Sequence, residues 1–118
     1  MTRYHLTTIA LLALSLPCCK NNENPARLQI ASAMETSLTT ELLDKWYPQA
    51  VDTVYGGFLS SFTYDFKPTG DQDKMIVSQA RHVWTNSKAA LRYPKVEHYK
   101  KSAKHGFEFL KNVMWDKE

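Results

Sequence analysis

The sequence predicts a mainly α-helical fold with one short β-hairpin, because three amphipathic stretches flank a single aromatic one. Apolar residues recur at steps of three and four in the helical stretches, and aromatic residues alternate at every second position in the other. The 118 residues, 43% hydrophobic and 23% charged, suit a folded chain of one domain at most. The net charge of +3 is spread along the chain, so no nucleic-acid partner is predicted.

The first eighteen residues have the pattern of an export signal. Arg3 precedes eleven mostly apolar residues, Leu6–Leu16. A membrane-spanning helix needs ~20 apolar residues, so this run is too short to span and has the length of the apolar region of a signal peptide. Residues 1–18 are therefore excluded from the fold, and residues 19–25 are predicted to be a linker.

The two cysteines follow the apolar run directly. The segment Leu16–Cys19 resembles a bacterial lipoprotein signal, in which a Cys at the cleavage site is acylated, and either Cys18 or Cys19 would be the acceptor. This likeness predicts an exported bacterial protein, periplasmic or anchored to the membrane by its lipid. Plain secretion and a retained anchor are the alternatives.

The first helix is predicted over about Ala26–Tyr47. Asn24 can cap its N-terminus, Pro25 fits the first helical position, and Pro48 ends the run. Its apolar residues, at steps of three and four, are Leu28, Ala31, Met34, Leu38, Leu42 and Trp46.

The glycine pair Gly56–Gly57 then interrupts the helical pattern. The segment Phe58–Phe66 is predicted to be a strand or one arm of a short hairpin, with Lys67–Gly70 as its turn. A second helix is predicted over about Lys74–Leu91. A third is predicted over about Val96–Met114, with most of its lysines on the face opposite the apolar one.

Arg81 is the sharpest single candidate for chemistry. On the second helix it shares a face with Val77 and Trp84, and a charged group is almost never fully buried unless it is paired. Two interpretations follow: an ion pair with a carboxylate such as Asp65 or Asp73, or a side chain that points into a polar cavity.

The motif Ala80–Trp84, together with Tyr55–Phe58 upstream, resembles the N-acylglucosamine 2-epimerase and cellobiose 2-epimerase family. The likeness covers about Leu42–Glu118. It implies that residues 26–118 are the first helices of an (α/α)6 barrel whose inner helices, the second helix among them, surround a sugar-binding cavity. It also implies a sugar 2-epimerase or aldose–ketose isomerase that acts on a hexose, an N-acyl hexosamine or the reducing end of a disaccharide.

By this resemblance Arg81 is the catalytic, substrate-binding arginine. Removing the proton at C2 of an open-chain sugar moves negative charge onto the carbonyl oxygen, and a fixed guanidinium stabilises that charge. Trp84 and Phe58 are expected as aromatic walls of the cavity, with core packing as the alternative. No cofactor and no metal is predicted.

Histidines move the proton in this family, and they are expected on later helices, beyond these residues. His82, His98 and His105 are expected to be ordinary surface or packing residues, because His82 lies about 100° from Arg81 on the helix and the other two lie among lysines.

A weak internal repeat, in which an apolar residue precedes Asp after the first and third helices, suggests that the 118 residues are a piece of a longer protein and are inactive alone. A complete three-helix domain is the alternative. Two other functions stay open: an (α/α)6 glycoside hydrolase, and a non-catalytic carbohydrate-binding lipoprotein. The sequence does not determine the oligomeric state.

Overall fold

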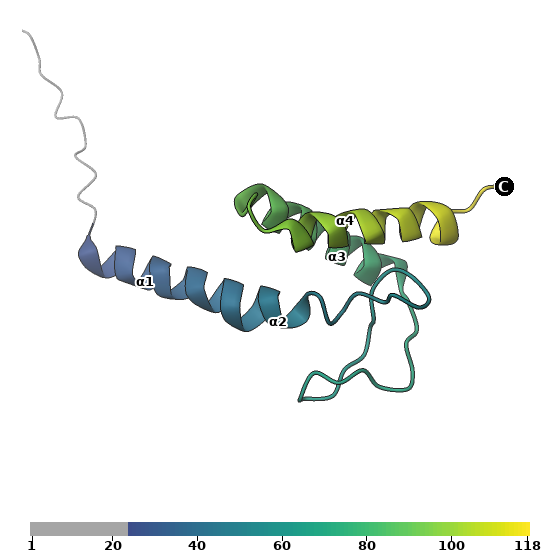
Figure 1. Ribbon diagram of the computed structural model, residues 1–118, viewed down its shortest axis with the longest axis horizontal. Coiled ribbons are helices and arrows are strands. Elements are labelled where there is room, and N and C mark those ends of the chain that lie inside the picture. Colours follow the sequence, from purple (N-terminus) through teal and green to yellow (C-terminus); the bar gives the residue numbers. More distant parts are fainter. Residues whose placement is uncertain (1–23) are drawn as a thin grey trace, which may run out of the picture.

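The computed structural model describes residues 24–118, and within them the mainly helical fold is confirmed (Figure 1). The predicted export signal and both candidate acceptors, Cys18 and Cys19, lie outside the described residues. The elements in chain order are α1 (Pro25–Thr36), η1 (Ser37–Leu43), α2 (Asp44–Trp46), α3 (Ile76–Arg92), α4 (Glu97–Phe109) and η2 (Leu110–Met114). None of the described helices has the length and apolar character needed to cross a membrane.

The first helical run extends through α1, η1 and α2, within one residue of the predicted bounds at either end. Asn24 caps it, because its side-chain oxygen accepts a hydrogen bond from Ala26 N at 3.0 Å. The run widens to a π-helix in η1, where the hydroxyls of Thr39 and Thr40 donate to carbonyls one turn earlier, at 2.9 and 2.8 Å. It ends at Trp46, just before the Tyr47–Pro48 bond.

The predicted strand between the first two helices is not formed within the described residues. Two isolated antiparallel bridges take its place, one joining Val51 to Phe58 and the other Phe62 to Pro68. Phe66 lies in the left-handed region at φ 60°, which interrupts the extended backbone. The strand or hairpin arm predicted over Phe58–Phe66 is therefore not confirmed, because the described residues contain only isolated bridges there and no regular ladder.

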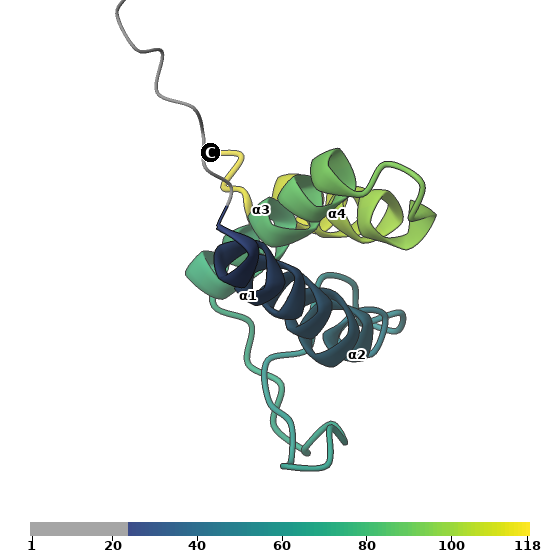
Figure 2. The same cartoon turned by 90° about the vertical axis from the view of Figure 1, so that its left-hand side faces the viewer.

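Helices α3 and α4 form an antiparallel pair joined by the short connection at 93–96. In both views they lie side by side, and the loop between α2 and α3 projects away from them (Figures 1 and 2). The bounds of α3 lie within two residues of the predicted second helix, and the run of α4 and η2 lies within one residue of the predicted third helix. The buried core between these helices and the loop consists of Leu43, Tyr47, Ala50, Phe58, Ala89 and Tyr99.

Gly106 allows α4 to approach this core. A Cβ atom at that position would collide with the ring of Phe58 and lie 2.7 Å from Val83 Cγ2. We expect Gly106→Ala to lower the free energy of unfolding by about 1–3 kcal/mol, because the packed neighbours cannot move aside freely. Urea unfolding measures the change.

Gly70→Ala is the matched control, because a Cβ atom at Gly70 would meet no atom within 4 Å. Its expected effect on stability is within about 0.5 kcal/mol. Equal unfolding midpoints for the two variants would contradict the close packing of α4 on Phe58.

Candidate functional site

Arg81 and Trp84 lie together on the exposed face of α3. They are one helical turn apart, Arg81 is exposed, and Trp84 keeps 64% of its surface accessible. Val77, one turn before Arg81, is 54% exposed on the same face. Lys88 Nζ lies 5.8 Å from the centroid of the Trp84 ring. The predicted sequence of apolar, cationic and aromatic groups is therefore presented to solvent in the described residues.

The ion pairs within residues 24–118 do not include Arg81. Asp65, one of its expected partners, pairs instead with Lys67 at 2.7 Å, and both of these side chains are largely exposed. The first interpretation of Arg81, a structural ion pair, is therefore not supported by the contacts of the described residues. Its guanidinium is left able to bind an oxygen anion from outside this part of the chain.

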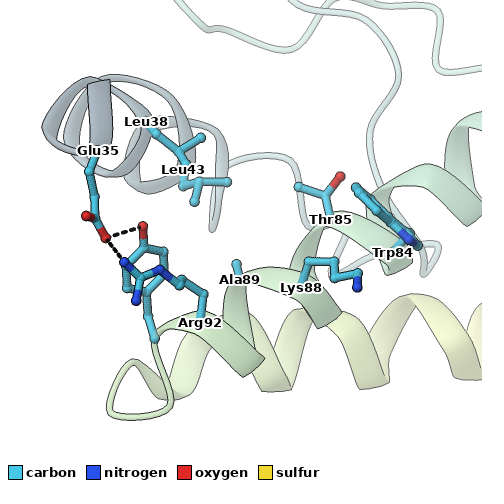
Figure 3. A pocket seen from close by; sticks show the side chains of 9 residues that line it. Glu35, Leu38, Leu43, Trp84, Thr85, Lys88, Ala89 and Arg92 are labelled. Carbon is cyan, nitrogen blue, oxygen red and sulfur yellow. Dashed lines mark hydrogen bonds and ion pairs between the residues drawn. The ribbon is translucent and has the colours of Figure 1, made fainter. Parts of the chain in front are cut away.

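A groove of about 500 Å³ between the first helical run and α3 includes Trp84 among its walls (Figure 3). Its far end is formed by Glu35, whose Oε1 accepts hydrogen bonds from Arg92 Nη2 at 2.9 Å and from the Tyr93 hydroxyl at 3.1 Å. Apolar side chains of η1 and α3 lie between these ends. The indole ring of Trp84 therefore lies at the border between this groove and the exposed face of α3 that carries Arg81.

Phe58 lies in the core rather than on an exposed wall. It is 0% exposed, its ring stacks on His82 with centroids 4.7 Å apart, and Tyr47 meets it edge-on at 6.0 Å. In the described residues the geometry therefore supports the packing alternative for Phe58. Of the site residues predicted from the sequence, Arg81 and Trp84 are the exposed ones.

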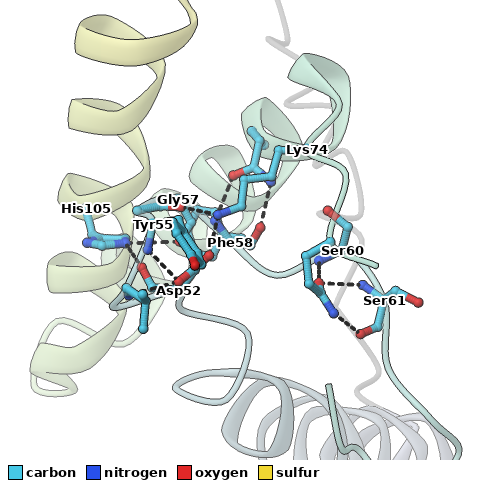
Figure 4. A network of polar contacts seen from close by, with 12 residues as sticks. Asp52, Tyr55, Gly57, Phe58, Ser60, Ser61, Lys74 and His105 are labelled. Carbon is cyan, nitrogen blue, oxygen red and sulfur yellow. Dashed lines mark hydrogen bonds and ion pairs between the residues drawn. The ribbon is translucent and has the colours of Figure 1, made fainter. Parts of the chain in front are cut away.

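The turn before Phe58 is held by a buried ion pair (Figure 4). Gly56 and Gly57 have φ values of 82° and 69°, which side chains rarely adopt, so the glycine pair is required by the backbone. Asp52 accepts hydrogen bonds from the amides of Val54 and Tyr55, both at 2.9 Å. Its second oxygen pairs with Lys74 Nζ, which also donates to Gly56 O at 2.6 Å.

Two further side chains fasten this turn to the helices. Gln79, fully buried on α3, accepts from Phe58 N and donates to Phe58 O, both at 2.8 Å. His105 Nε2 on α4 contacts the carbonyls of Asp52 and Gly57 at 3.1 and 3.0 Å. Because both partners are acceptors, this nitrogen must carry a proton. The turn and α3 are therefore positioned as one unit, which fixes where Arg81 stands.

Sequence reasoning assigned no role to Asp52, Lys74 or Gln79, and it expected His105 to be an ordinary surface or packing residue. The spacing of Asp52 before the Gly-Gly pair is a recognisable signal for a carboxylate that caps a turn. No local pattern indicates the contacts of Gln79 and His105, because their partners are 21 and about 50 residues away in the chain.

Asp52 should make stability depend on acid pH. Burial alone raises the pKa of its carboxyl group, but the hydrogen bonds from Lys74, Tyr55 and Val54 outweigh burial and hold the pKa below the ordinary 3.8. A carboxyl whose folded pKa is lowered contributes its stability above the unfolded pKa and loses it as the pH falls through the folded one. We expect Asp52→Asn to reduce the loss of stability between about pH 5 and pH 2, measured by urea unfolding at each pH.

Asp65→Asn is the control for this pH dependence. The pKa of Asp65 is also lowered, by hydrogen bonds from Lys67 and Thr63, but its ion pair is exposed and screened by solvent. Its substitution should leave the pH profile of stability nearly unchanged. A profile that responds to Asp65 and not to Asp52 would contradict the assignment.

The histidines of the described chain have packing roles. His82 stacks on Phe58 and lies 2.8 Å from the Tyr47 hydroxyl through Nδ1. Burial lowers the pKa of His82 and raises the pKa of Tyr47 to about 12. His98 Nε2 lies 3.6 Å from Asp44 Oδ1. His82 and His105 are thus engaged with neighbouring groups within the described residues.

The arrangement offers binding and charge stabilisation: a cation and an aromatic ring, exposed one turn apart on a helix fixed by a buried network. Within residues 24–118 no group of three or more His, Cys, Asp and Glu side chains is placed to hold a metal ion.

Comparison with known proteins gives one informative similarity. No protein-family model matches the chain. Over 85 residues, 72% of its length, the chain is 34% identical to a cellobiose 2-epimerase of Bacteroides fragilis. The chain spans about a fifth of the length of this curated relative, 21%. The match supports a relationship to sugar epimerase-like enzymes, at the level of the family and over this segment only.

Proposed function

We propose that these residues belong to a sugar 2-epimerase or aldose–ketose isomerase, and that Arg81 binds the carbonyl oxygen of its open-chain substrate. The observation that carries the proposal is Arg81 exposed one turn before Trp84 on α3, without an ion pair in the described residues. The similarity to a cellobiose 2-epimerase supports the same chemistry.

The proposed reaction removes the proton from C2 of the open-chain sugar. The electrons of the C2–H bond form a C1=C2 double bond, and the carbonyl π electrons move onto O1 to give an enediolate. The guanidinium of Arg81, with its planar fork of donors, donates hydrogen bonds to O1 as the negative charge there grows. Return of the proton to the other face of C2 re-forms the C1 carbonyl and gives the epimer. Protonation of C1, with transfer of the O2 hydroxyl proton to O1, forms the carbonyl at C2 and gives the ketose.

Trp84 is proposed to hold the sugar ring beside Arg81. Its exposed indole presents a large apolar face with one N–H donor, which suits the mixed surface of a sugar. The groups that move the proton are proposed to come from residues outside the 118, in an (α/α)6 barrel of which these helices are the first. By themselves the 118 residues are therefore expected to show no turnover.

Solvent deuterium exchange tests the proposal. The whole protein that carries these residues is incubated in D₂O with cellobiose, mannobiose, mannose or N-acetylglucosamine, and NMR follows the C2 proton. Loss of that signal together with formation of the C2 epimer or the ketose is the expected result. No exchange with any of these sugars would contradict the proposal, and new reducing ends without exchange would indicate the glycoside hydrolase alternative. Binding without either change would indicate a non-catalytic carbohydrate-binding lipoprotein.

We also propose that the protein is exported and acylated at Cys18 or Cys19, through the signal pattern of residues 1–18. Metabolic labelling with a fatty acid analogue tests this proposal in a bacterial host. The label should be lost in Cys18→Ala or in Cys19→Ala, which identifies the acceptor. A wild-type protein without label would exclude the lipid anchor.

A further inference from the structure

A second cavity, of about 480 Å³, lies on the loop between α2 and α3, away from Arg81 and Trp84. Its lining contains no side chain that is charged at neutral pH. The lining residues are Trp46, Ser60, Ser61, Phe62, Thr63, Tyr64 and Phe66. Three of the alternating aromatic residues, Phe62, Tyr64 and Phe66, line this cavity. The function proposed above assigns no role to them.

The base of the cavity is a set of aromatic rings held against one another. The ring of Trp46 lies 5.1 Å from that of Phe62, tilted by 52°, and 5.7 Å from that of Phe66, nearly edge-on at 83°. These are favourable aromatic geometries, so the rings support each other without a bound molecule. Aromatic faces carry partial negative charge and attract the weakly positive C–H bonds on the flat face of a sugar ring.

Tyr64 stands at the rim and is fully exposed, at 101% of its reference surface. No hydrogen bond engages its hydroxyl within the described residues. A large aromatic side chain held in water with no neighbour gains apolar contact whenever a ligand ring enters the cavity. It is therefore the side chain best placed to close over such a ring.

The polar part of the rim is fixed in place by Gln72. Its Oε1 accepts from the amides of Ser60 and Ser61, at 2.8 and 3.2 Å, and its Nε2 donates to Ser61 O at 2.8 Å. The backbone groups are thus satisfied by one side chain. Both serine hydroxyls remain unengaged within residues 24–118 and can bond to the hydroxyls of a ligand.

We propose that this cavity is a subsite for one neutral sugar ring of an oligosaccharide. The aromatic base takes the C–H face of the ring, the two serine hydroxyls take its hydroxyl groups, and the uncharged lining favours a neutral sugar over a uronic acid. The proposal goes beyond the function proposed above, and it does not require Arg81 to act in catalysis.

Photolabelling of the whole protein tests the subsite. The probe is cellotetraose that carries a diazirine, and the label is located by tryptic digestion and mass spectrometry. The expected site lies in the fragment 46–74, which contains every lining residue, and not in the next fragment, which contains Arg81. Excess unlabelled cellotetraose should compete for this site, and tetragalacturonic acid, which is anionic, should not.

Tyr64→Ala should reduce labelling of fragment 46–74 by roughly 3- to 10-fold, the loss expected for one aromatic contact. Tyr55→Ala is the matched control, because Tyr55 is 82% exposed in the same fragment but does not line the cavity. Its labelling should be unchanged, and both variants should fold, because the side chains removed are exposed.

Three outcomes would overturn the subsite: no label in fragment 46–74, label that excess cellotetraose does not displace, or equal labelling of the Tyr64→Ala and Tyr55→Ala variants. Deuterium exchange at C2, measured on the same samples, reports separately on the function proposed above. Label with no exchange supports the subsite alone, and exchange with no label supports the function alone.

Discussion

Arg81→Ala is expected to lower the rate of deuterium exchange at C2 by about 10²–10³-fold in the whole protein, the loss typical for removal of one oxyanion donor. The side chain is exposed and makes none of the ion pairs of the described residues, so the fold should persist. Steady-state exchange rates and a urea unfolding curve measure both quantities on one sample.

Two variants make the Arg81 result specific. Arg81→Lys keeps the charge but loses the planar fork of donors, so its rate should fall between those of the wild type and Arg81→Ala. Arg92→Ala removes another exposed arginine of α3, one that pairs with Glu35, and should leave exchange nearly unchanged. An equal loss of rate in Arg81→Ala and Arg92→Ala would contradict a direct role for Arg81.

Phe58→Ala is expected to lower the free energy of unfolding by about 3–5 kcal/mol, because it empties a fully buried site at the centre of the core. A loss of this size is a large part of the stability of most domains. The milder Phe58→Leu keeps most of the volume and should still fold, with a loss of about 1–1.5 kcal/mol. Urea unfolding measures both variants.

Comparison with Trp84→Ala separates packing from substrate contact. Trp84 is 64% exposed, so its removal should change stability by no more than about 0.5 kcal/mol while it raises KM. Phe58→Leu should do the reverse and lower stability with KM unchanged. A rise in KM for Phe58→Leu at unchanged stability would contradict the packing role and support Phe58 as part of the wall of a sugar cavity.

The helices were predictable because their determinants are local. Asn24 and Pro25 begin the first helix, the Tyr47–Pro48 pair follows its end, and Tyr93–Pro94 separates α3 from α4. The apolar period then gives the extent of each helix. The π-helical widening of η1 and η2 was not predicted, because it does not alter that period enough to be recognised.

The loop was harder to predict because its hydrogen bonds come from distant side chains. Alternating aromatics are compatible with a strand, but a ladder forms only if backbone groups find one another. Here the side chain of Gln72 accepts hydrogen bonds from the amides of Ser60 and Ser61. The side chain of Gln79 forms hydrogen bonds with both the N–H and the C=O of Phe58. A glutamine that substitutes for a partner strand has no local sequence signature.

Some features of the candidate site could likewise be predicted from the sequence, and others could not. The sequence by itself determined that Arg81 and Trp84 share a helical face, because their three-residue spacing decides it. It also determined that His82 points elsewhere. It left Phe58 undecided, since an aromatic residue after a turn suits a core and a cavity wall equally.

Only the tertiary structure decided which faces are covered. Gly106 leaves room for the ring of Phe58, His82 stacks on that ring, and the opposite face of α3 with Arg81 remains open. The face of a helix on which a residue lies follows from backbone geometry, so it can be predicted from the residue's position in the sequence. Burial depends on which segments meet across tens of residues, and that is settled only when the chain packs.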